Sequence, residues 1–160
     1  MNQTAFEEAV LGLKDAMYRL SCAYLKGEHD RLDAISEAVL KAWIKLDSLR
    51  DPAKFRPFLL RILIRECVNI QRRQRRVIPA EMPETPETAA FDQDPLEHQA
   101  LREALDHLPE QLRVPLLLHY MEGLEVQEIA RLLGATKGAV CSRLKRGREK
   151  LKALLSEEEI

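Results

Sequence analysis

The residue types that most often carry catalysis are scattered along this chain of 160 residues. The histidines and cysteines are His29, His98, His107, His119, Cys22, Cys67 and Cys141. They share no spacing typical of a metal site, no glycine-rich phosphate loop is present, and no nucleophile has a base placed by a motif. The sequence therefore predicts a protein that is not an enzyme and that uses no metal, cofactor or small-molecule substrate.

The three cysteines are odd in number and widely spaced, which argues against a disulfide framework and favours a reduced, cytoplasmic setting. The first residues, MNQTAFEEAV, lack the basic start and apolar run of a signal peptide. No apolar stretch approaches the ~20 residues that a membrane-spanning helix needs, so we expect no direct membrane insertion.

Basic side chains are the remaining candidates for chemistry, and that chemistry is the binding of polyanions. Acidic and basic residues nearly balance over the whole chain, at 26 against 25. Residues 50–76, however, hold nine basic side chains against two acidic ones, and residues 137–152 hold seven against one. Residues 77–98 hold six acidic side chains and no lysine or arginine. Two basic blocks separated by an acidic one predict two nucleic-acid-binding surfaces joined by a spacer.

Helical periodicity dominates the chain outside its middle, which predicts an all-α fold of two small domains. Three helices are expected in the N-terminal domain, residues 1–76: one from Phe6 to Tyr24, one from Leu32 to Leu46 with a buried Ile35–Val39–Trp43 line, and one opening near Pro57. Residues 77–95 hold four of the eight prolines and no periodic pattern, which predicts a flexible, acidic linker.

Residues 96–160 predict a four-helix domain, with a kink at Pro115. Its last two helices, over 126–133 and 137–154, are expected to form a helix-turn-helix. Gly134 suits the left-handed residue that ends a helix, and Thr136 suits the N-cap of the next.

The final helix has two unlike faces. Its apolar stripe consists of Val140, Leu144, Gly147 and Leu151. The opposite arc has small and basic side chains, which suits a recognition helix in a DNA groove. An ordinary helical hairpin with a solvated basic face is the alternative, and the tight turn and the cap favour DNA binding.

Two segments resemble domains of bacterial sigma factors. The segment similar to the C-terminal, promoter-reading domain of these factors is LPEQLRVPLLLHYMEGLEVQEIARLLGATKGAVCSRLKRGREKLKALL. The segment similar to their N-terminal domain is MYRLSCAYLKGEHDRLDAISEAVLKAWIKLDSLRDPAKFRPFLLRILIRECVNIQRRQRR. Their order and spacing resemble the extracytoplasmic-function (ECF) group of the sigma-70 family. The resemblance implies binding to core RNA polymerase and to the minus-10 and minus-35 elements of promoter DNA, with help in opening the DNA. It also implies an anti-sigma factor as a partner.

In this family one face of the second helix binds a coiled coil on the polymerase clamp. The matching residues here are Asp33, Ser36, Glu37, Leu40, Lys41 and Ile44. Leu40 and Ile44 lie off the Ile35–Val39–Trp43 line, so this helix has more apolar surface than one buried stripe needs. Packing of these residues against the other helices of the domain is the alternative.

Residues 49–61 resemble the element that captures the non-template strand at minus-10. The minus-10 contacts that the resemblance implies are Arg50, Lys54, Phe55, Arg56, Phe58, Arg61 and Arg65. The cations would track phosphates, and the two rings could stack on extruded bases, with a core role for Phe58 as the alternative. Phe58 stands where the family often has Trp, and Arg65 where Asn is frequent. The run 72–76 is expected to bind duplex DNA non-specifically, with a solvated helix end as the alternative.

The implied minus-35 contacts lie on the recognition helix. They are Lys137, Cys141, Ser142, Arg143, Lys145 and Arg146. Cys141 stands where the family often has Arg, and a thiol cannot make the bidentate contact of Arg with guanine, so we expect a different or weaker preference there. Arg143 lies nearer the buried stripe, which favours a phosphate contact or an internal ion pair. A stand-alone helix-turn-helix regulator that never touches polymerase is the alternative function.

Overall fold

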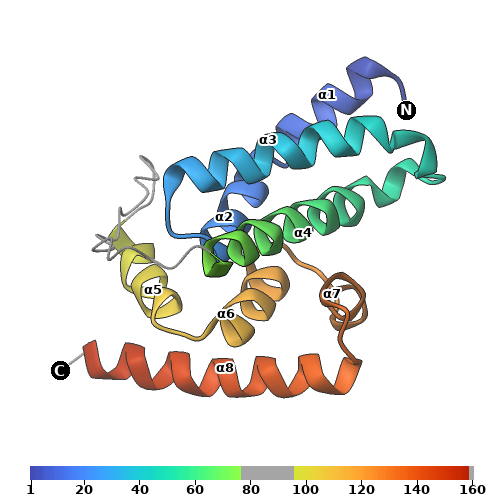
Figure 1. The fold of residues 1–160 in the computed structure, drawn as a ribbon. Helices are drawn as coiled ribbons and strands as arrows, with labels where there is room; N and C mark the ends of the chain where they lie inside the picture. The colour runs from blue at the N-terminus through green and yellow to red at the C-terminus, as the bar shows by residue number, and fades with distance from the viewer. Residues whose placement is uncertain (77–95, 159–160) are drawn as a thin grey trace. The chain divides into compact units, whose positions relative to one another are not determined.

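The computed structural model describes residues 1–76 and 96–158, and these residues form helices and connecting turns with no strand (Figure 1). The chain divides into two compact units, Met1–Thr88 and Ala89–Ile160, which we call the N-terminal and C-terminal units. The all-α, two-domain fold expected from the sequence is thus confirmed. The expected linker, residues 77–95, lies outside the described residues. None of the described helices is long and apolar enough to cross a membrane.

The N-terminal unit begins with two short helices where the sequence predicted one. α1 (Gln3–Gly12) and α2 (Lys14–Tyr24) are separated at Leu13, whose backbone has φ −103° and ψ 6°. Gly12, a poor helix former at this junction, accounts for the interruption. The described part of this unit therefore contains four α-helices rather than three, since α3 (Glu28–Ile44) and α4 (Phe55–Arg76) follow.

Helices α3 and α4 lie side by side, run in opposite directions and form the most extensive helix pair of the unit. Two 3-10 turns, η1 (Leu46–Ser48) and η2 (Pro52–Lys54), connect them. α4 starts two residues before Pro57, which keeps the proline in the first turn, where its missing N–H is tolerated.

The buried line of α3 differs from the expected one. Ala34, Ala38 and Ala42 are fully buried, whereas Trp43 remains 44% exposed. Ile35 and Val39 are only half-buried, so the prediction of a buried Ile35–Val39–Trp43 line was wrong. The helix is rotated about its axis relative to that prediction, with the alanines facing the core. Three methyl groups at four-residue spacing allow the helices to approach closely, so the bulky side chains flank the contact.

Buried polar groups tie the ends of α2, α3 and α4 together. Arg31 donates from Nε to the carbonyl of Leu25 at 2.9 Å, and Gln71 donates to the carbonyl of Tyr24 at 2.9 Å. The Tyr18 hydroxyl donates to Glu28 at 2.5 Å, and burial together with this hydrogen bond raises the pKa of the hydroxyl. Arg31 and Gln71 thereby satisfy two carbonyls that the end of α2 leaves open.

The C-terminal unit contains α5 (Leu96–Asp106), α6 (Glu110–Leu116), α7 (Val126–Leu133) and α8 (Lys137–Glu158). The irregularity expected at Pro115 is present, since α6 passes into a π-helical turn, η3 (Leu117–Met121), directly after it. The N–H of Glu122 bonds to the carbonyl of Leu117 at 3.2 Å, which is the wider repeat of a π-turn.

The predicted helix-turn-helix is confirmed in its local geometry. Gly134 has φ +64° and ends α7 in the left-handed conformation. The Thr136 hydroxyl accepts from the N–H of Ala139 at 3.1 Å and so caps α8. Val140, Leu144 and Gly147 are buried, which turns the opposite arc of α8 to solvent.

Candidate protein and nucleic-acid interfaces

The outward face of α3, opposite its buried alanines, carries several exposed apolar side chains. Leu32, Leu40, Trp43 and Ile44 are exposed by 51%, 52%, 44% and 68%. At ~100° per residue these four side chains fall within an arc of about 120° centred opposite Ala38. The alternative that Leu40 and Ile44 pack against other helices is therefore wrong. An exposed apolar stripe of this kind is typical of a surface that binds another protein.

Polar residues from the sequence prediction accompany this stripe. Asp33, Ser36 and Glu37 are exposed on α3, and Lys41 is half-buried at its flank. Leu32 and Trp43 belong to the same face but were not predicted as part of it, because Trp43 had been assigned to the buried line and Leu32 only to the start of the helix. The signal that could have found them is the spacing of Ala34, Ala38 and Ala42, which marks the opposite side of the helix as the contact face.

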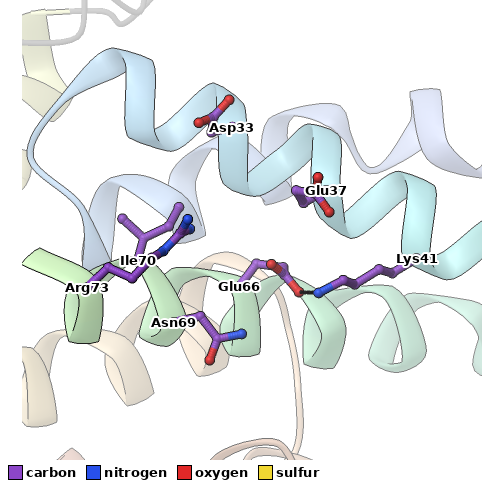
Figure 2. A pocket seen from close by; sticks show the side chains of 7 residues that line it. All are labelled: Asp33, Glu37, Lys41, Glu66, Asn69, Ile70 and Arg73. Atoms are coloured by element: carbon purple, nitrogen blue, oxygen red, sulfur yellow. Dashed lines mark hydrogen bonds and ion pairs between the residues drawn. The ribbon is translucent and has the colours of Figure 1, made fainter.

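A groove of about 410 Å³ runs between the flanks of α3 and α4. Figure 2 shows its lining, which is Asp33, Glu37 and Lys41 from α3 and Glu66, Asn69, Ile70 and Arg73 from α4. The Nζ atom of Lys41 lies 2.5 Å from Oε1 of Glu66 across the groove. Glu66 is buried, and the sequence analysis had not singled it out. The groove borders the outward face of α3 and is mixed in charge.

The predicted minus-10 residues divide into exposed cations and packed rings. Arg50, Lys54, Arg61 and Arg65 are exposed, whereas Arg56 and Phe58 are half-buried. Phe55 is only 4% exposed, with its ring edge-on to Phe6 at 5.6 Å between centroids. Phe55 therefore has no free face for a base in this structure. Its ring lies 6.2 Å from that of Phe58 between centroids, at 44° between ring planes.

Four cations of α4 lie on one face of the helix, in two pairs. Arg61, Arg65, Arg72 and Arg76 are all exposed, and at ~100° per residue they fall within about 60° of one another around the helix. Side chains aligned in this way can follow a phosphate backbone. One pair belongs to the predicted minus-10 residues and the other to the basic run at the end of α4.

The recognition helix α8 presents its predicted residues outward. Lys137, Cys141, Ser142, Lys145 and Arg146 are exposed, and Arg143 is half-buried as its place beside the apolar stripe implied. Small residues at the start of the helix, Gly138 and Ala139, leave room for close approach to a groove. This surface suits the major groove of DNA, which admits one α-helix.

An apolar groove of about 610 Å³ in the C-terminal unit was not expected. Leu105, Leu117 and Leu151 are among its lining residues, from α5, η3 and α8. Tyr120 stands at the groove with 57% of its surface exposed, and its hydroxyl accepts from Nη1 of Arg148 at 2.9 Å. The sequence analysis had assigned Leu151 to the apolar stripe of the last helix and had not singled out Leu105 or Leu117. The π-turn that carries Tyr120 could not be predicted from periodicity. Among the described residues, no group of three His, Cys, Asp or Glu side chains could hold a metal ion.

Comparison with known proteins agrees with this arrangement of two units. Residues 10–77 match the family model of sigma-70 region 2, and residues 98–151 match that of sigma-70 region 4. The ECF RNA polymerase sigma factor EcfG of Rhodopseudomonas palustris (strain TIE-1) is 31% identical over 135 residues, which cover 82% of this chain and 75% of the relative.

The RNA polymerase sigma factor SigV of Bacillus subtilis (strain 168) is 27% identical over 147 residues, covering 92% of this chain and 89% of the relative. The solved structure of the sigma factor RpoE in complex with the anti-sigma factor NepR from Bartonella quintana has the same fold, with a TM-score of 0.82, 23% identity and coverage of 94% and 96%. Both sigma-70 domains are thus matched, in order and over most of the chain. The protein belongs to the ECF group of the sigma-70 family of RNA polymerase sigma factors.

Proposed function

We propose that this sigma factor binds core RNA polymerase through the outward face of α3, captures the minus-10 element with the start of α4 and reads the minus-35 element with α8. The catalysis of transcription then belongs to the polymerase, and the protein works in the cytoplasm. The minus-10 and polymerase surfaces fall to residues 1–76 and the minus-35 surface to residues 96–160.

The single observation that carries the polymerase contact is the apolar stripe on α3. Leu40 and Ile44 are more than half exposed on the side opposite the buried alanines. Apolar side chains held at helical spacing fit the seam of a coiled coil, where each inserts between side chains of the partner. Asp33 and Ser36 lie among these apolar side chains and Glu37 lies at one edge of them, so the three would supply the polar contacts of the same face.

For the minus-10 element, the exposed cations support phosphate tracking. Arg50, Lys54, Arg61 and Arg65 would follow the displaced strand, with Arg56 and Phe58 closer to the protein. Phe58 is the ring that remains partly exposed, so we assign base stacking to it. Phe55 contributes by holding Phe58 in place.

For the minus-35 element, Lys137, Ser142, Lys145 and Arg146 would contact bases or phosphates, with Arg143 as a phosphate contact. Cys141 lies among them and is exposed. A thiol offers weak hydrogen bonding, so we expect Cys141 to permit contact without specifying guanine.

An anti-sigma factor is the expected regulator. The exposed stripe of α3 and the apolar groove of the C-terminal unit support such a partner, because the stripe exposes Leu40 and Ile44 and the groove has Tyr120 and Met121 exposed at its lining. The solved structure of RpoE from Bartonella quintana holds an anti-sigma factor, and that protein shares the present fold.

The test is transcription in vitro with sigma-free bacterial core polymerase on fragmented genomic DNA from the source organism. We expect discrete start sites only when the protein is added, and alignment of the upstream DNA should give two conserved elements. Specific DNA retention without any new transcript would overturn the proposal and favour a stand-alone helix-turn-helix regulator.

A parallel binding experiment separates the surfaces. Glu37→Lys should abolish binding to core polymerase while leaving the circular dichroism spectrum unchanged, because Glu37 is exposed. Unchanged polymerase binding by this variant would show that the α3 surface has been assigned wrongly.

A further inference from the structure

One ion pair connects the polymerase-facing helix with the DNA-facing helix. Nζ of Lys41 on α3 and Oε1 of Glu66 on α4 are 2.5 Å apart, and Figure 2 shows the two side chains extended toward each other across the groove. The Glu66 side chain is 9% exposed and that of Lys41 is 41% exposed. The carboxylate is therefore fixed by its surroundings, whereas the ammonium group reaches the surface.

Glu66 is the only acidic residue of α4, a helix with seven arginines. None of these arginines lies three or four residues from Glu66, so none is placed to pair with its carboxylate along the helix. The carboxylate is paired instead with Lys41 on the other helix. The hydrogen bond from Lys41 to Glu66 is the main cause that raises the pKa of the Lys41 ammonium group, and Glu37 raises it to a smaller extent. Glu37 lies one turn before Lys41 on α3, so without Glu66 the ammonium group would have a competing partner on its own helix.

We propose that Glu66 is a positioning residue for the polymerase-binding surface, because its carboxylate holds the Lys41 ammonium group at the edge of the α3–α4 groove before polymerase arrives. The inference rests on the proposed function, in which Lys41 contacts polymerase. A lysine side chain loses much rotamer freedom when it is immobilised, so fixing it in advance lowers the entropic cost of binding. Glu66 itself is buried and makes no contact with the partner.

The test is a double-mutant cycle on the affinity of the full-length protein for core polymerase. The four proteins are the wild type, Glu66→Gln, Lys41→Met and the double variant. We expect Glu66→Gln to weaken binding by about fivefold, which is the upper range for a partly exposed ion pair. In the Lys41→Met background the same change should have no further effect, since Glu66 then has no lysine to position. Glu8→Gln, an exposed glutamate on α1, is the matched control and should bind as the wild type does.

A charge exchange distinguishes positioning from plain stabilisation. The pair Lys41→Glu with Glu66→Lys restores an ion pair between α3 and α4 but gives the surface the opposite charge. We expect its melting temperature to recover relative to either single variant, while the affinity for polymerase stays low. Recovery of both quantities together would assign Glu66 a structural role only.

The outcomes separate the two proposals. If Lys41→Met weakens binding and Glu66→Gln does not, positioning by Glu66 is overturned and the polymerase surface stands. If Glu66→Gln weakens binding equally in both backgrounds, Glu66 acts through the fold, and the inference also fails. If neither change alters the affinity, the inference fails, and Leu40→Glu decides independently whether α3 binds polymerase at all.

Discussion

The indole ring of Trp43 lies against the ring of Phe6, with 5.0 Å between ring centroids and 58° between ring planes. Phe6 is the one buried side chain of α1, and it also meets Phe55 edge-on at the start of α4. Pairs of this geometry stabilise beyond the area they bury. A single phenylalanine from the first helix thus joins the end of α3, the proposed polymerase-binding helix, to the start of α4, which carries the predicted minus-10 residues.

Phe6→Ala should destabilise the N-terminal unit by about 3 kcal/mol, because burial and two ring contacts are lost at once. Trp43 is the only tryptophan of the chain, so its fluorescence reports directly on this site. We expect a red-shifted emission maximum and a lower denaturation midpoint. Leu11→Ala, at a position 70% exposed on the same helix, should leave both quantities unchanged.

Leu40→Glu and Ile44→Glu should each reduce the affinity for core polymerase by tenfold or more, because a charge would be placed in the middle of an apolar contact. Both side chains are exposed, so the free energy of unfolding should change by less than ~0.5 kcal/mol. Binding is measured by competition with a labelled sigma factor. Leu11→Glu provides the control, and a loss of affinity in that variant as well would contradict a localised surface on α3.

Lys145→Ala should weaken promoter binding and reduce the slope of log affinity against log salt by about 1, because one phosphate contact and its released counterion are removed. The measurement is fluorescence anisotropy of labelled promoter DNA across a salt series. Lys150, also exposed, lies about 140° further round α8, so Lys150→Ala should keep the wild-type slope. Equal slopes for both variants would argue against Lys145 as a phosphate contact.

Cys141→Arg should change the sequence preference of α8 rather than its fold. The thiol is exposed on the DNA-facing arc, so an arginine fits without repacking. An arginine there can bind guanine through two hydrogen bonds, which discriminates by about 1–3 kcal/mol against other bases. Selection from a randomised minus-35 region should show a new guanine. Cys141→Ser, with no such capacity, should select the same sequences as the wild type.

Gly147→Val should lower the free energy of unfolding of the C-terminal unit by about 2 kcal/mol. A Cβ atom on Gly147 would lie 2.8 Å from Cδ1 and 3.1 Å from Cγ of Leu116, which is itself buried. Gly138 has nothing within 4 Å of the same construction, so Gly138→Ala should stabilise α8 by about 0.5–1 kcal/mol. Thermal melts of both variants measure the difference, and a stabilised Gly147→Val would contradict the packing described for α6 and α8.

Periodicity and turn chemistry were sufficient to predict the helical elements and the helix-turn-helix. Gly134 and Thr136 have local roles that depend on their own backbone, so their functions as helix end and cap could be predicted without tertiary contacts. The break at Leu13 was missed because apolar residues continue in helical spacing across it. The length of the π-turn after Pro115 likewise depends on packing that a sequence pattern does not contain.

The candidate polymerase surface was predicted only in part, for a physical reason. A large apolar side chain such as Trp43 is expected in the core. The buried side of α3 is instead formed by three alanines, so the Trp43 side chain remains partly exposed. Glu66 could not be assigned from spacing, because its partner Lys41 is 25 residues away on another helix. Arg61, Arg65 and the predicted α8 residues other than Arg143 are exposed, as expected. Their exposure could be predicted because an amphipathic helix carries its charged side chains on the face opposite its apolar one.

The alanine line of α3 also has a mechanical consequence. A methyl group has no rotamers to change, so the seam formed by Ala34, Ala38 and Ala42 cannot yield by rearranging side chains when a load is applied. A force applied to Leu40 or Ile44 would then move α3 and α4 together, and the arginines of α4 would move with them. The angle between the outward face of α3 and the arginines of α4 is thereby set when the chain folds. Under the proposed function, a partner docked on Leu40 and Ile44 would also orient the arginines that meet the DNA.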